Sequence, residues 1–499
     1  MRVQMVARAA QGEESMGLLT VEELREVISV KVLAGQGSLS GKRRIRQIST
    51  DSRLIRRGDL FVALRGDRFD GHEFVPAVLA QGAAGAIVHD EYRLPPSSAA
   101  VRRIDGRAAP FLFGVRDPLF AYQQLATHYR SRFTIPVVAV TGSNGKTTTK
   151  EMVAAVLAQR WSVLKTDGNF NNRIGVPATL FRLTARHQAA VIEMGVDQQG
   201  QTTRLCEIVR PTIGVITNIG PDHLEFFGSM EGSAQAKAEL LDQLPSDGMA
   251  ILNADDPFFD YLAARAQCRV MSFGFSEMAD VRASGVVSDA RHGTTFRLHL
   301  PGKSRPTTVR IKVHGAHNVT NALAAAAVGA ALSLSGSMIA QGLGRFRPAA
   351  MRSQVVTHHG VHIVNDCYNA NPASMKAAIQ LLAQWSPARK RIAVLGDMLE
   401  LGPETGRLHR DVGQFLAQQG VSRLIVCGTL GRDIAEGARQ GGMAGLQIDE
   451  VADAVAAADH LKRIVQQGDV VLVKASRGMK LEQVVQALTG MRAIIKQAS

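Results

Sequence analysis

The chain has 499 residues, a net charge of +14, 45% hydrophobic residues and 20% charged residues. This composition is typical of a globular protein with about three domains of ~100–200 residues each, and no apolar run approaches the ~18–20 residues of a membrane helix. The positive charge is spread about evenly along the chain and only 5% of residues are aromatic, which argues against a nucleic-acid-binding tail or a base-stacking surface.

The first region, residues 1–115, is predicted to be a small α/β domain. Its first residues, MRVQMVARAAQGEESMG, lack the apolar core of a signal peptide and are expected to form a frayed extension. Apolar residues recur at helical spacing over Thr20–Ala34, which predicts a helix. Residues 58–64 and 84–88 are predicted to be short strands, with the turn-rich stretch RGDRFDGHEF between them.

The middle region, residues 116–346, alternates apolar strands with helices. We expect strands at 135–140, 189–194, 212–217 and 249–252, and helices at 147–159, 233–244 and 318–332. Such alternation predicts a doubly wound parallel sheet with helices on both faces. Residues 281–314 instead favour short antiparallel strands, inserted before the last of these helices.

The third region, residues 347–499, repeats the alternating plan. Strands are predicted near 361–365, 391–395, 423–427 and 469–473. This pattern predicts a second, Rossmann-like α/β domain, and the proline in Arg347-Pro348 suits a hinge before it.

The motif TGSNGKTTT, residues 141–149, directly follows an apolar run that is predicted to be a buried strand. A strand, a glycine turn and a helix start form an anion site, because backbone N–H groups point inward and the helix dipole adds positive charge. Gly142 and Gly145 permit the tight turn, Lys146 can reach the β- and γ-phosphates, and Thr147 can hold Mg²⁺. Strict P-loop spacing asks for an earlier glycine that this chain lacks, so the loop is a shortened form. The alternative is an ordinary helix N-cap, but we expect a nucleoside triphosphate site.

Three polar side chains follow strands of the predicted central sheet. Glu193 closes the run AAVIEMG, His223 lies in TNIGPDHLEFFGS, and Lys237 lies in SAQAKAELL, early on the next helix. If the strand ends converge on the phosphate loop, all three face one triphosphate, and carboxylate and imidazole can bind Mg²⁺. Each residue alone has an ordinary alternative, such as a surface or capping glutamate or a turn histidine.

The third region contains NDCYNANPASMKAAI at 365–379 and LGDMLELG at 395–402. Asp366 ends a predicted strand, and Asn369 and Asn371 shape the loop before the next helix. Carboxylates and amides there can hold a ribose, a metal or a substrate amine. The alternative is turn chemistry alone, since Asn and Pro are common turn formers.

Taken together, these stretches resemble the Mur ligase family, the ATP-dependent amide-forming enzymes of peptidoglycan precursor synthesis. The shared motifs run from STDSR and GDLFVALRG through TGSNGKTT, NIGPDHLEFFGS and GAHNVTNALAAAA to VLVKASRGMKLE. The resemblance implies a UDP-substrate-binding domain at 1–115, an ATP-binding P-loop domain at 116–346, and a ligase domain that binds the incoming dipeptide at 347–499.

The resemblance also implies roles for individual residues. The ATP site would include Gly142, Ser143, Asn144, Gly145, Lys146, Thr147, Thr148, Asn318, Asn321, Arg352 and Asp366. Mg²⁺ would be held by Thr147, Glu193, His223 and a carbamylated Lys237, and the residues expected to act in catalysis are Lys146, His223 and Lys237. The substrates would contact Ser49, Asp51, Ser52 and Arg53 at the UDP end, and Tyr368, Asn369, Asn371 and Asp397 at the dipeptide end.

NDCYNANPASM and LGDMLELG are narrower and are similar to the family branch that adds D-alanyl-D-alanine to UDP-N-acetylmuramoyl-tripeptide. The implied chemistry is activation of the tripeptide carboxylate by ATP as an acyl phosphate, followed by attack of the dipeptide amine. The open alternatives are another Mur-type ligase, a ligase like folylpolyglutamate synthetase, or a nucleic-acid-associated P-loop ATPase.

The four cysteines lie far apart, with no CxxC pair and no histidine at zinc spacing. This argues against a structural zinc or a disulfide framework and favours a reducing cytoplasm. We expect a cytoplasmic monomer with no nucleic-acid partner and no insertion into a membrane.

Overall fold

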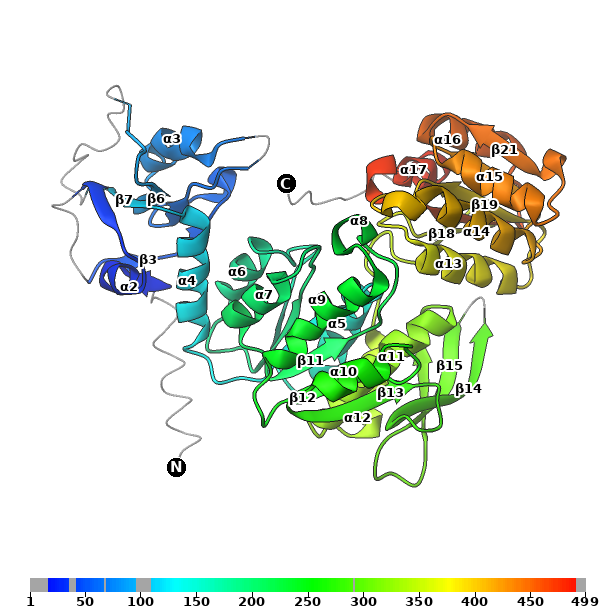
Figure 1. Cartoon of the computed structure of the whole chain (residues 1–499), viewed down its shortest axis with the longest axis horizontal. Coiled ribbons are helices and arrows are strands. Elements are labelled where there is room, and N and C mark those ends of the chain that lie inside the picture. The colour runs from blue at the N-terminus through cyan, green and yellow to red at the C-terminus, as the bar shows by residue number, and fades with distance from the viewer. Residues whose placement is uncertain (1–16, 36–41, 67–68, 96–108, 290–291, 491–499) are drawn as a thin grey trace.

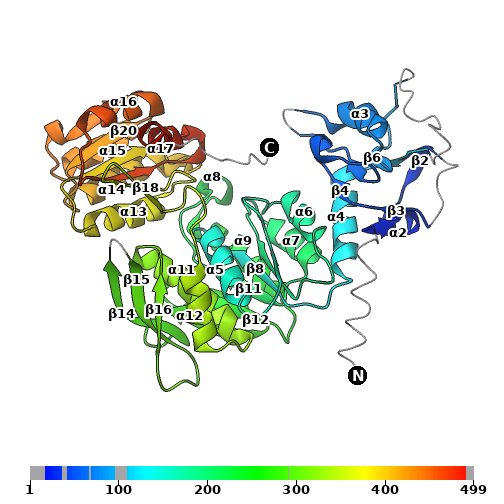
Figure 2. The same cartoon turned by 180° about the vertical axis from the view of Figure 1, so that it is seen from behind.

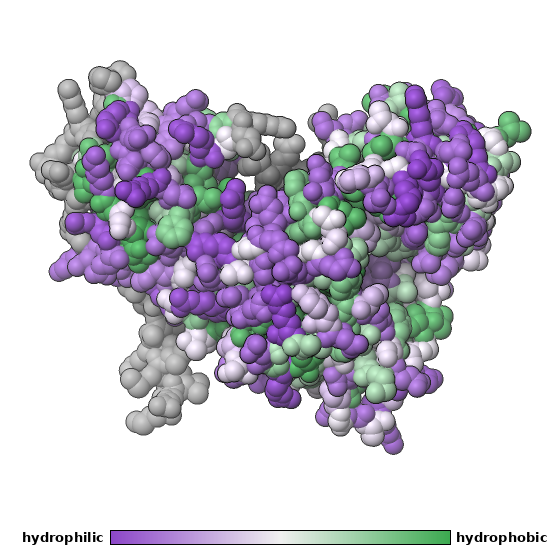
Figure 3. Space-filling model, viewed as in Figure 1, coloured by the Kyte–Doolittle hydropathy of each residue, from purple (hydrophilic) through white to green (hydrophobic). Residues whose placement is uncertain are grey.

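The computed structural model describes residues 17–35, 42–66, 69–95, 109–289 and 292–490. These residues form three lobes, with the first and third regions on opposite sides of the central region (Figures 1 and 2). Figure 3 shows polar side chains over most of one face and a hollow between the first and third lobes. Residues 1–16 of the expected N-terminal extension lie outside the described residues, as do Asp67 and Arg68.

The first region has a five-stranded sheet of order β2-β7-β6-β5-β4 and a two-stranded sheet, β1-β3. Its elements are β1 (Leu19–Thr20), α2 (Val21–Val27), β2 (Lys31–Ala34), β3 (Arg44–Ile45), β4 (Ile48–Ser49), β5 (Leu60–Val62), α3 (Val75–Ala80), β6 (Gly85–His89) and β7 (Phe111–Val115). The small α/β lobe and both predicted strands are confirmed.

The helix expected over Thr20–Ala34 is wrong in its second half. Thr20 caps α2 through a reciprocal pair of hydrogen bonds with Glu23, and the helix ends at Val27. The chain then enters β2, which pairs antiparallel with β7. Pairing with a strand about 80 residues away overrides the local helical spacing.

The central region forms one nine-stranded sheet of order β16-β15-β14-β13-β12-β11-β8-β10-β9. Its strands are β8 (Val137–Thr141), β9 (Val163–Lys165), β10 (Ala189–Glu193), β11 (Ile213–Ile216), β12 (Met249–Asn253), β13 (Arg269–Gly274), β14 (Val281–Asp289), β15 (Gly293–His299) and β16 (Thr307–Ile311). Neighbours from β9 to β14 are parallel, whereas β14, β15 and β16 pair antiparallel. Both the parallel core and the antiparallel insertion are therefore confirmed.

Helices cover both faces of this sheet. They are α4 (Pro118–Arg130), α5 (Lys146–Leu157), α6 (Gly175–Leu180), α7 (Gln201–Val209), α8 (Leu224–Phe227), α9 (Met230–Asp242), α10 (Phe259–Arg265), α11 (Ala316–Ala331) and α12 (Gly336–Arg345). Successive residues of β8 point to opposite faces. Val138 and Val140 pack with α5 and α11, and Val137 and Ala139 pack with α4, α7 and α9. The sheet is doubly wound, as predicted.

The third region has a six-stranded sheet of order β17-β18-β22-β19-β20-β21. Its strands are β17 (Gln354–His358), β18 (Val361–Asn365), β19 (Arg391–Gly396), β20 (Arg423–Cys427), β21 (Ile448–Val451) and β22 (Val470–Lys474). Its helices are α13 (Pro372–Gln384), α14 (Thr405–Ala417), α15 (Gly431–Gln440), α16 (Ala454–Ile464) and α17 (Glu482–Thr489). One core lies under α13, α14 and α15 and the other under α16 and α17, which confirms the Rossmann-like plan.

The order of the central strands places the phosphate loop. β8 lies between β10 and β11, so the chain leaves β8 toward one side of the sheet and later returns to the other. Open α/β sheets bind ligands at such a point, beyond the carboxyl ends of the strands. The turn between β8 and α5 lies there.

Candidate functional site

A cavity of about 1350 Å³ is lined by residues of all three regions. Most of the predicted site residues line it: Ser143, Asn144, Gly145, Lys146, Thr148, Glu193, His223, Asn318, Asn321, Arg352, Asp366, Tyr368, Asn369 and Asn371. The others are not part of its lining: Ser49, Asp51, Ser52, Arg53, Gly142, Thr147, Lys237 and Asp397.

The turn between β8 and α5 depends on its two glycines. Gly142 has φ +133° and Gly145 has φ +78°, conformations that other residues rarely adopt. A Cβ on Gly142 would lie 2.0 Å from Thr217 Oγ1, and one on Gly145 would lie 2.3 Å from Asn321 Oδ1. Any side chain at either position would therefore force the loop to move.

The residues after β11 hold the loop in place. Asn218 accepts hydrogen bonds from the backbone N–H of Ser143 through its carbonyl (2.9 Å) and from that of Asn144 through Oδ1 (3.0 Å). Thr217 Oγ1 donates to the carbonyl of Asn144 (2.5 Å). The loop is therefore ordered by the protein itself.

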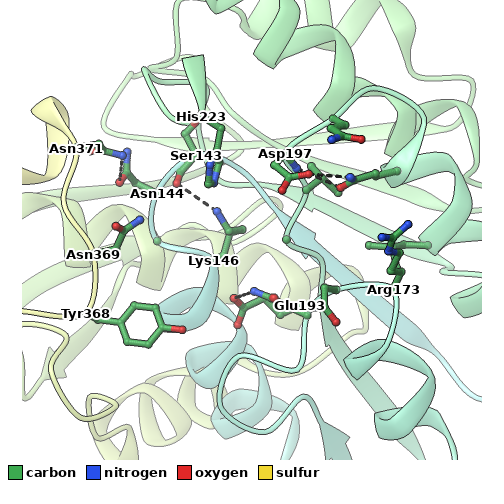
Figure 4. Close-up of a pocket in the computed structure, with 18 of the residues that line it drawn as sticks. Ser143, Asn144, Lys146, Arg173, Glu193, Asp197, His223, Tyr368, Asn369 and Asn371 are labelled. Atoms are coloured by element: carbon green, nitrogen blue, oxygen red, sulfur yellow. Dashed lines mark hydrogen bonds between the residues drawn. The ribbon is translucent and has the colours of Figure 1, made fainter. Parts of the chain in front are cut away.

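Lys146 begins α5 and folds back over the loop. Its Nζ donates to the carbonyl oxygens of Gly142 (2.6 Å) and Ser143 (3.2 Å). Figure 4 shows the hydrogen bond to Ser143. Burial lowers the pKa of Lys146, while the carboxylates of Asp222 and Glu193 act in the opposite direction. The lysine adds its charge to the N-terminus of α5, which also favours an anion.

Glu193 ends β10 and is almost fully buried. Its Oε1 accepts from Thr147 Oγ1 (3.0 Å) and Asn171 Nδ2 (2.9 Å), whereas Oε2 has no hydrogen-bond partner. The buried Nζ of Lys150 lies 3.8 Å from that oxygen. A buried carboxylate oxygen without a hydrogen bond is costly, so this atom suits a cation. Asn171 and Lys150 were not predicted, although Lys150 lies one helical turn after Lys146.

Lys237 pairs with a carboxylate that was not predicted. Its Nζ lies 3.1 Å from Asp222 Oδ1 and donates to Ser233 Oγ (2.7 Å). Asp222 Oδ1 also accepts from Ser143 Oγ (2.6 Å), which connects the pair to the phosphate loop. Burial lowers the pKa of Lys237 to about 8, with Asp222 opposing. His223, next to Asp222, was predicted from the sequence, but the sequence could not show that the side chain of Asp222 is the one that pairs with Lys237.

His223 contacts the third region, where its Nδ1 lies 2.6 Å from Glu400 Oε2. Within the described part of the chain, no three His, Cys, Asp or Glu side chains gather as a metal-binding group. The four residues predicted to hold Mg²⁺ form three separate pairings: Thr147 with Glu193, Lys237 with Asp222, and His223 with Glu400.

The two asparagines predicted to lie near the adenine are on α11. Asn318 Nδ2 donates to the carbonyl of His314 (2.8 Å). Asn321 Oδ1 accepts from Thr149 Oγ1 on α5 (3.2 Å). Both line the cavity, so the start of α11 forms a polar wall beside the phosphate loop.

Asp366, just after β18, pairs with Lys474 at the end of β22 (2.7 Å) and accepts from the backbone N–H of Ser353 (2.7 Å). Burial raises the pKa of Asp366, but Lys474 and the hydrogen bonds outweigh burial and lower it. The guanidinium of Arg352 lies 4.0 Å from the ring centre of Tyr368, a cation–π contact. Lys474 was not predicted, although VLVKASRGMKLE places it at a strand end.

Asn371 joins the third region to the phosphate loop. Its Oδ1 caps α13 by accepting from the backbone N–H of Ser374 (2.9 Å). Its Nδ2 donates to Asn144 Oδ1 (2.9 Å; Figure 4). Asp397 lies elsewhere, because its buried carboxylate accepts from the backbone N–H of Leu430 (3.0 Å).

Asn371→Ala should reduce the free energy of unfolding by about 1 kcal/mol, the usual cost of losing an N-cap. Asn371→Asp should keep the cap, because Asp and Asn cap equally well, so it should lose less stability than Asn371→Ala although it also loses the hydrogen bond to Asn144. Its added negative charge beside the phosphate loop should nevertheless slow turnover. Urea titration followed by tryptophan fluorescence, to which Trp385 at the C-cap of α13 contributes, measures the first effect. Equal loss of stability in both variants would show that capping is not the role of Asn371.

The predicted residues at the UDP end form their own surface cluster. The Arg53 guanidinium donates to both carboxylate oxygens of Asp51 (2.9 and 2.8 Å) and thereby lowers the pKa of Asp51. The first region instead contributes Arg65 and His72 to the cavity lining, from the described parts of the stretch RGDRFDGHEF. Both side chains contact Asp70.

Sequence models of three domains match this chain. "Mur ligase family, catalytic domain" matches residues 44–111, "Mur ligase middle domain" matches residues 140–329, and "Mur ligase, glutamate ligase domain" matches residues 351–477. The chain belongs to the Mur ligase family. The three matched segments fall in the three lobes of this Mur ligase.

Individual relatives are similar over nearly their whole length. The UDP-N-acetylmuramoyl-tripeptide–D-alanyl-D-alanine ligase of Bacillus subtilis is 38% identical over 89% of this chain and 93% of its own. The Escherichia coli ligase of the same name is 34% identical over 94% and 98%.

Solved structures agree with these relatives. A crystal structure of MurF from Acinetobacter baumannii has a TM-score of 0.83 at 32% identity, over 95% of this chain and 99% of its own. MurF ligase from Thermotoga maritima in complex with ADP has a TM-score of 0.77 at 28% identity, over 89% and 96%. No helix in the described part of this Mur ligase has the length and hydropathy of a membrane span.

Proposed function

We propose that this Mur ligase joins D-alanyl-D-alanine to UDP-N-acetylmuramoyl-tripeptide in the cytoplasm, at the expense of ATP. The observation that carries the proposal is the likeness to ligases of that name over 93% and 98% of their length. The glycine loop and Lys146 support ATP as the phosphoryl donor, and a similar structure was solved with ADP.

The proposed reaction has two steps. A carboxylate oxygen of the tripeptide attacks the γ-phosphorus of ATP, ADP leaves, and an acyl phosphate forms. The neutral amine of D-alanyl-D-alanine then attacks the acyl carbon, inorganic phosphate leaves, and the nitrogen loses a proton to give the amide. Water would hydrolyse the acyl phosphate, so closure of the three lobes around the cavity is expected to protect it.

The phosphate loop is proposed to bind and orient the triphosphate. The N-terminus of α5, with the backbone of residues 145–148, would supply N–H donors. Lys146 would leave the carbonyls that it now contacts and bind phosphate oxygens, where it stabilises charge in the transition state. Asn318, Asn321, Arg352 and Asp366 are proposed to contact the adenosine part, since all four line the cavity.

The residues near the loop fit Mg²⁺. The unbonded Oε2 of buried Glu193 and the hydroxyl of Thr147 are oxygen ligands of the type that magnesium prefers. Asp222 Oδ2 is likewise buried without a hydrogen bond. When bound, Mg²⁺ would offset the charge of the phosphates and of the tripeptide carboxylate. We propose Thr147 and Glu193 as ligands beside the phosphate loop and His223 as a further ligand.

Lys237 is proposed to become carbamylated and to offer its new carboxylate to the metal. Its pKa of about 8 supports this, because a lower pKa leaves more of the neutral amine that reacts with CO₂. The ion pair with Asp222 opposes it, since a carbamate would repel that carboxylate. Carbamylation must therefore break this pair and free Asp222 to turn toward a cation.

The two substrates are proposed to approach from opposite lobes, residues 1–115 for the UDP end and residues 347–499 for the dipeptide. Arg53→Ala should then raise the KM for the UDP substrate, with little change in the KM for D-alanyl-D-alanine. The reason is that the exposed Arg53 belongs to the cluster proposed to bind the UDP end of the substrate. Steady-state kinetics with each substrate varied in turn measures this. Arg56→Ala, another exposed arginine, is the control; equal effects on both substrates would contradict the division.

Mass spectrometry of the product tests the proposed function. The full chain is incubated with ATP, Mg²⁺, UDP-N-acetylmuramoyl-tripeptide and D-alanyl-D-alanine. The expected product is the UDP-peptide extended by the dipeptide with the loss of one water. Extension by a single amino acid, but never by the dipeptide, would assign the chain to another Mur-type ligase.

A further inference from the structure

Glu400 connects the motif LGDMLELG to the phosphate-loop side of the cavity. Glu400 Oε2 lies 2.6 Å from His223 Nδ1, across the boundary between the third and central regions. The carbonyl of Glu400 also accepts from the backbone N–H of Glu225 (3.4 Å). Gly402 approaches the same backbone, since a Cβ there would lie 3.4 Å from Glu225 Cα.

The loop that presents Glu400 is anchored on the third region. The backbone N–H of Met398 donates to His409 Nε2 (2.9 Å), and that of Leu399 donates to Ser476 Oγ (2.9 Å). Glu400 itself has φ +64°, and His223 has φ +50°. Both residues are held in a conformation that non-glycine residues avoid, and such conformations gather at functional sites.

The contact with Glu400 determines which ring nitrogen of His223 carries the hydrogen. An ionised carboxylate can only accept hydrogen bonds, so His223 Nδ1 carries the hydrogen that Glu400 accepts. In the neutral ring, Nε2 then keeps its lone pair, and His223 lines the cavity. Histidines that bind metals commonly donate their other ring N–H to a carboxylate, which sets the orientation of the ring.

We propose that Glu400 is the positioning residue for His223, so that docking of the third region aims the histidine at the metal site. The proposal rests on the proposed role of His223 in holding Mg²⁺. The lobe that is proposed to present the dipeptide amine would thereby also orient a residue that is proposed to hold Mg²⁺. Metal binding and docking of the third region are then coupled through one side-chain pair.

Calorimetric titration of Mg²⁺ into the full chain saturated with ADP tests the proposal. Glu400→Ala should weaken Mg²⁺ binding about 10-fold or more, the usual effect of removing such a partner. Glu400→Gln should weaken it less, because its amide oxygen can still accept from Nδ1. Glu404→Ala is the matched control, since Glu404 is exposed and forms an ion pair with Arg407 on its own lobe. Unchanged Mg²⁺ affinity in Glu400→Ala would overturn the proposal.

The ring of His223 gives a second readout that does not depend on turnover. Histidine-selective ¹⁵N labelling, with His223→Gln for assignment, should show the Nδ1–H form in the parent protein. Glu400→Ala should shift His223 toward the Nε2–H form, and an unchanged ring would count against the pairing. If the unsubstituted protein fails to extend the UDP-peptide by the dipeptide while Glu400→Ala still weakens Mg²⁺ binding, the proposed function fails and the positioning role of Glu400 stands.

Discussion

Lys146→Ala is expected to reduce turnover at least ~100-fold while the protein stays folded. The Lys146 ammonium donates hydrogen bonds to two loop carbonyls, and the packing of α5 rests on Met152, Val153 and Val156 instead. Removing one preorganised charge from a phosphoryl-transfer site typically costs ~10²–10³-fold in rate. ATP-dependent phosphate release, with circular dichroism as the check on folding, measures the effect.

Lys303→Ala is the matched control for this prediction, because it removes the same charge from an exposed turn after β15. It should leave turnover unchanged. A folded Lys146→Ala protein with near-normal activity would remove the phosphate-loop assignment.

Lys237→Ala is expected to be nearly inactive and to recover partly when acetate or formate is added. Alanine leaves a space beside Asp222 and Ser233 that a short carboxylate can enter in place of the carbamate. Breaking a buried ion pair also costs about 3–5 kcal/mol, so the variant should be less stable. Recovery of rate separates the chemical role from this structural loss.

Two further measurements sharpen the test of Lys237. Ser233→Ala removes a hydrogen bond to Lys237 but no charge, so added acetate should not raise its rate. In the parent protein, ¹³C-labelled bicarbonate should produce a carbamate signal that Lys237→Ala lacks. Full activity of Lys237→Ala without added carboxylate would contradict the carbamate.

The parts of the site that could be predicted are those whose residues are adjacent in sequence. TGSNGKTTT follows an apolar strand and precedes a helix, so its geometry is set locally and the glycine conformations agree with the predicted turn. The alternation of strands and helices likewise predicts two parallel sheets. Glu193 and Thr147 could be associated because Glu193 ends one strand and Thr147 follows another, and both strands were expected to end at the same edge of a doubly wound sheet.

The remaining features depend on contacts between distant segments. Asp222 could not be distinguished from its neighbours, because the burial of its side chain depends on Lys237 and Ser143. Glu400 reaches His223 only after two separate lobes dock, which no local pattern encodes. The error over Thr20–Ala34 has the same cause, since the pairing of β2 with β7 decides between helix and strand.

The most direct test of the proposed ligase reaction is phosphate release from ATP, measured with UDP-N-acetylmuramoyl-tripeptide in the presence and absence of D-alanyl-D-alanine. If an acyl phosphate forms and the dipeptide amine captures it, sustained phosphate release requires both substrates and equals the amount of amide formed. Phosphate release that is stimulated by DNA or RNA, and is unaffected by the UDP-tripeptide and the dipeptide, would contradict the proposed reaction.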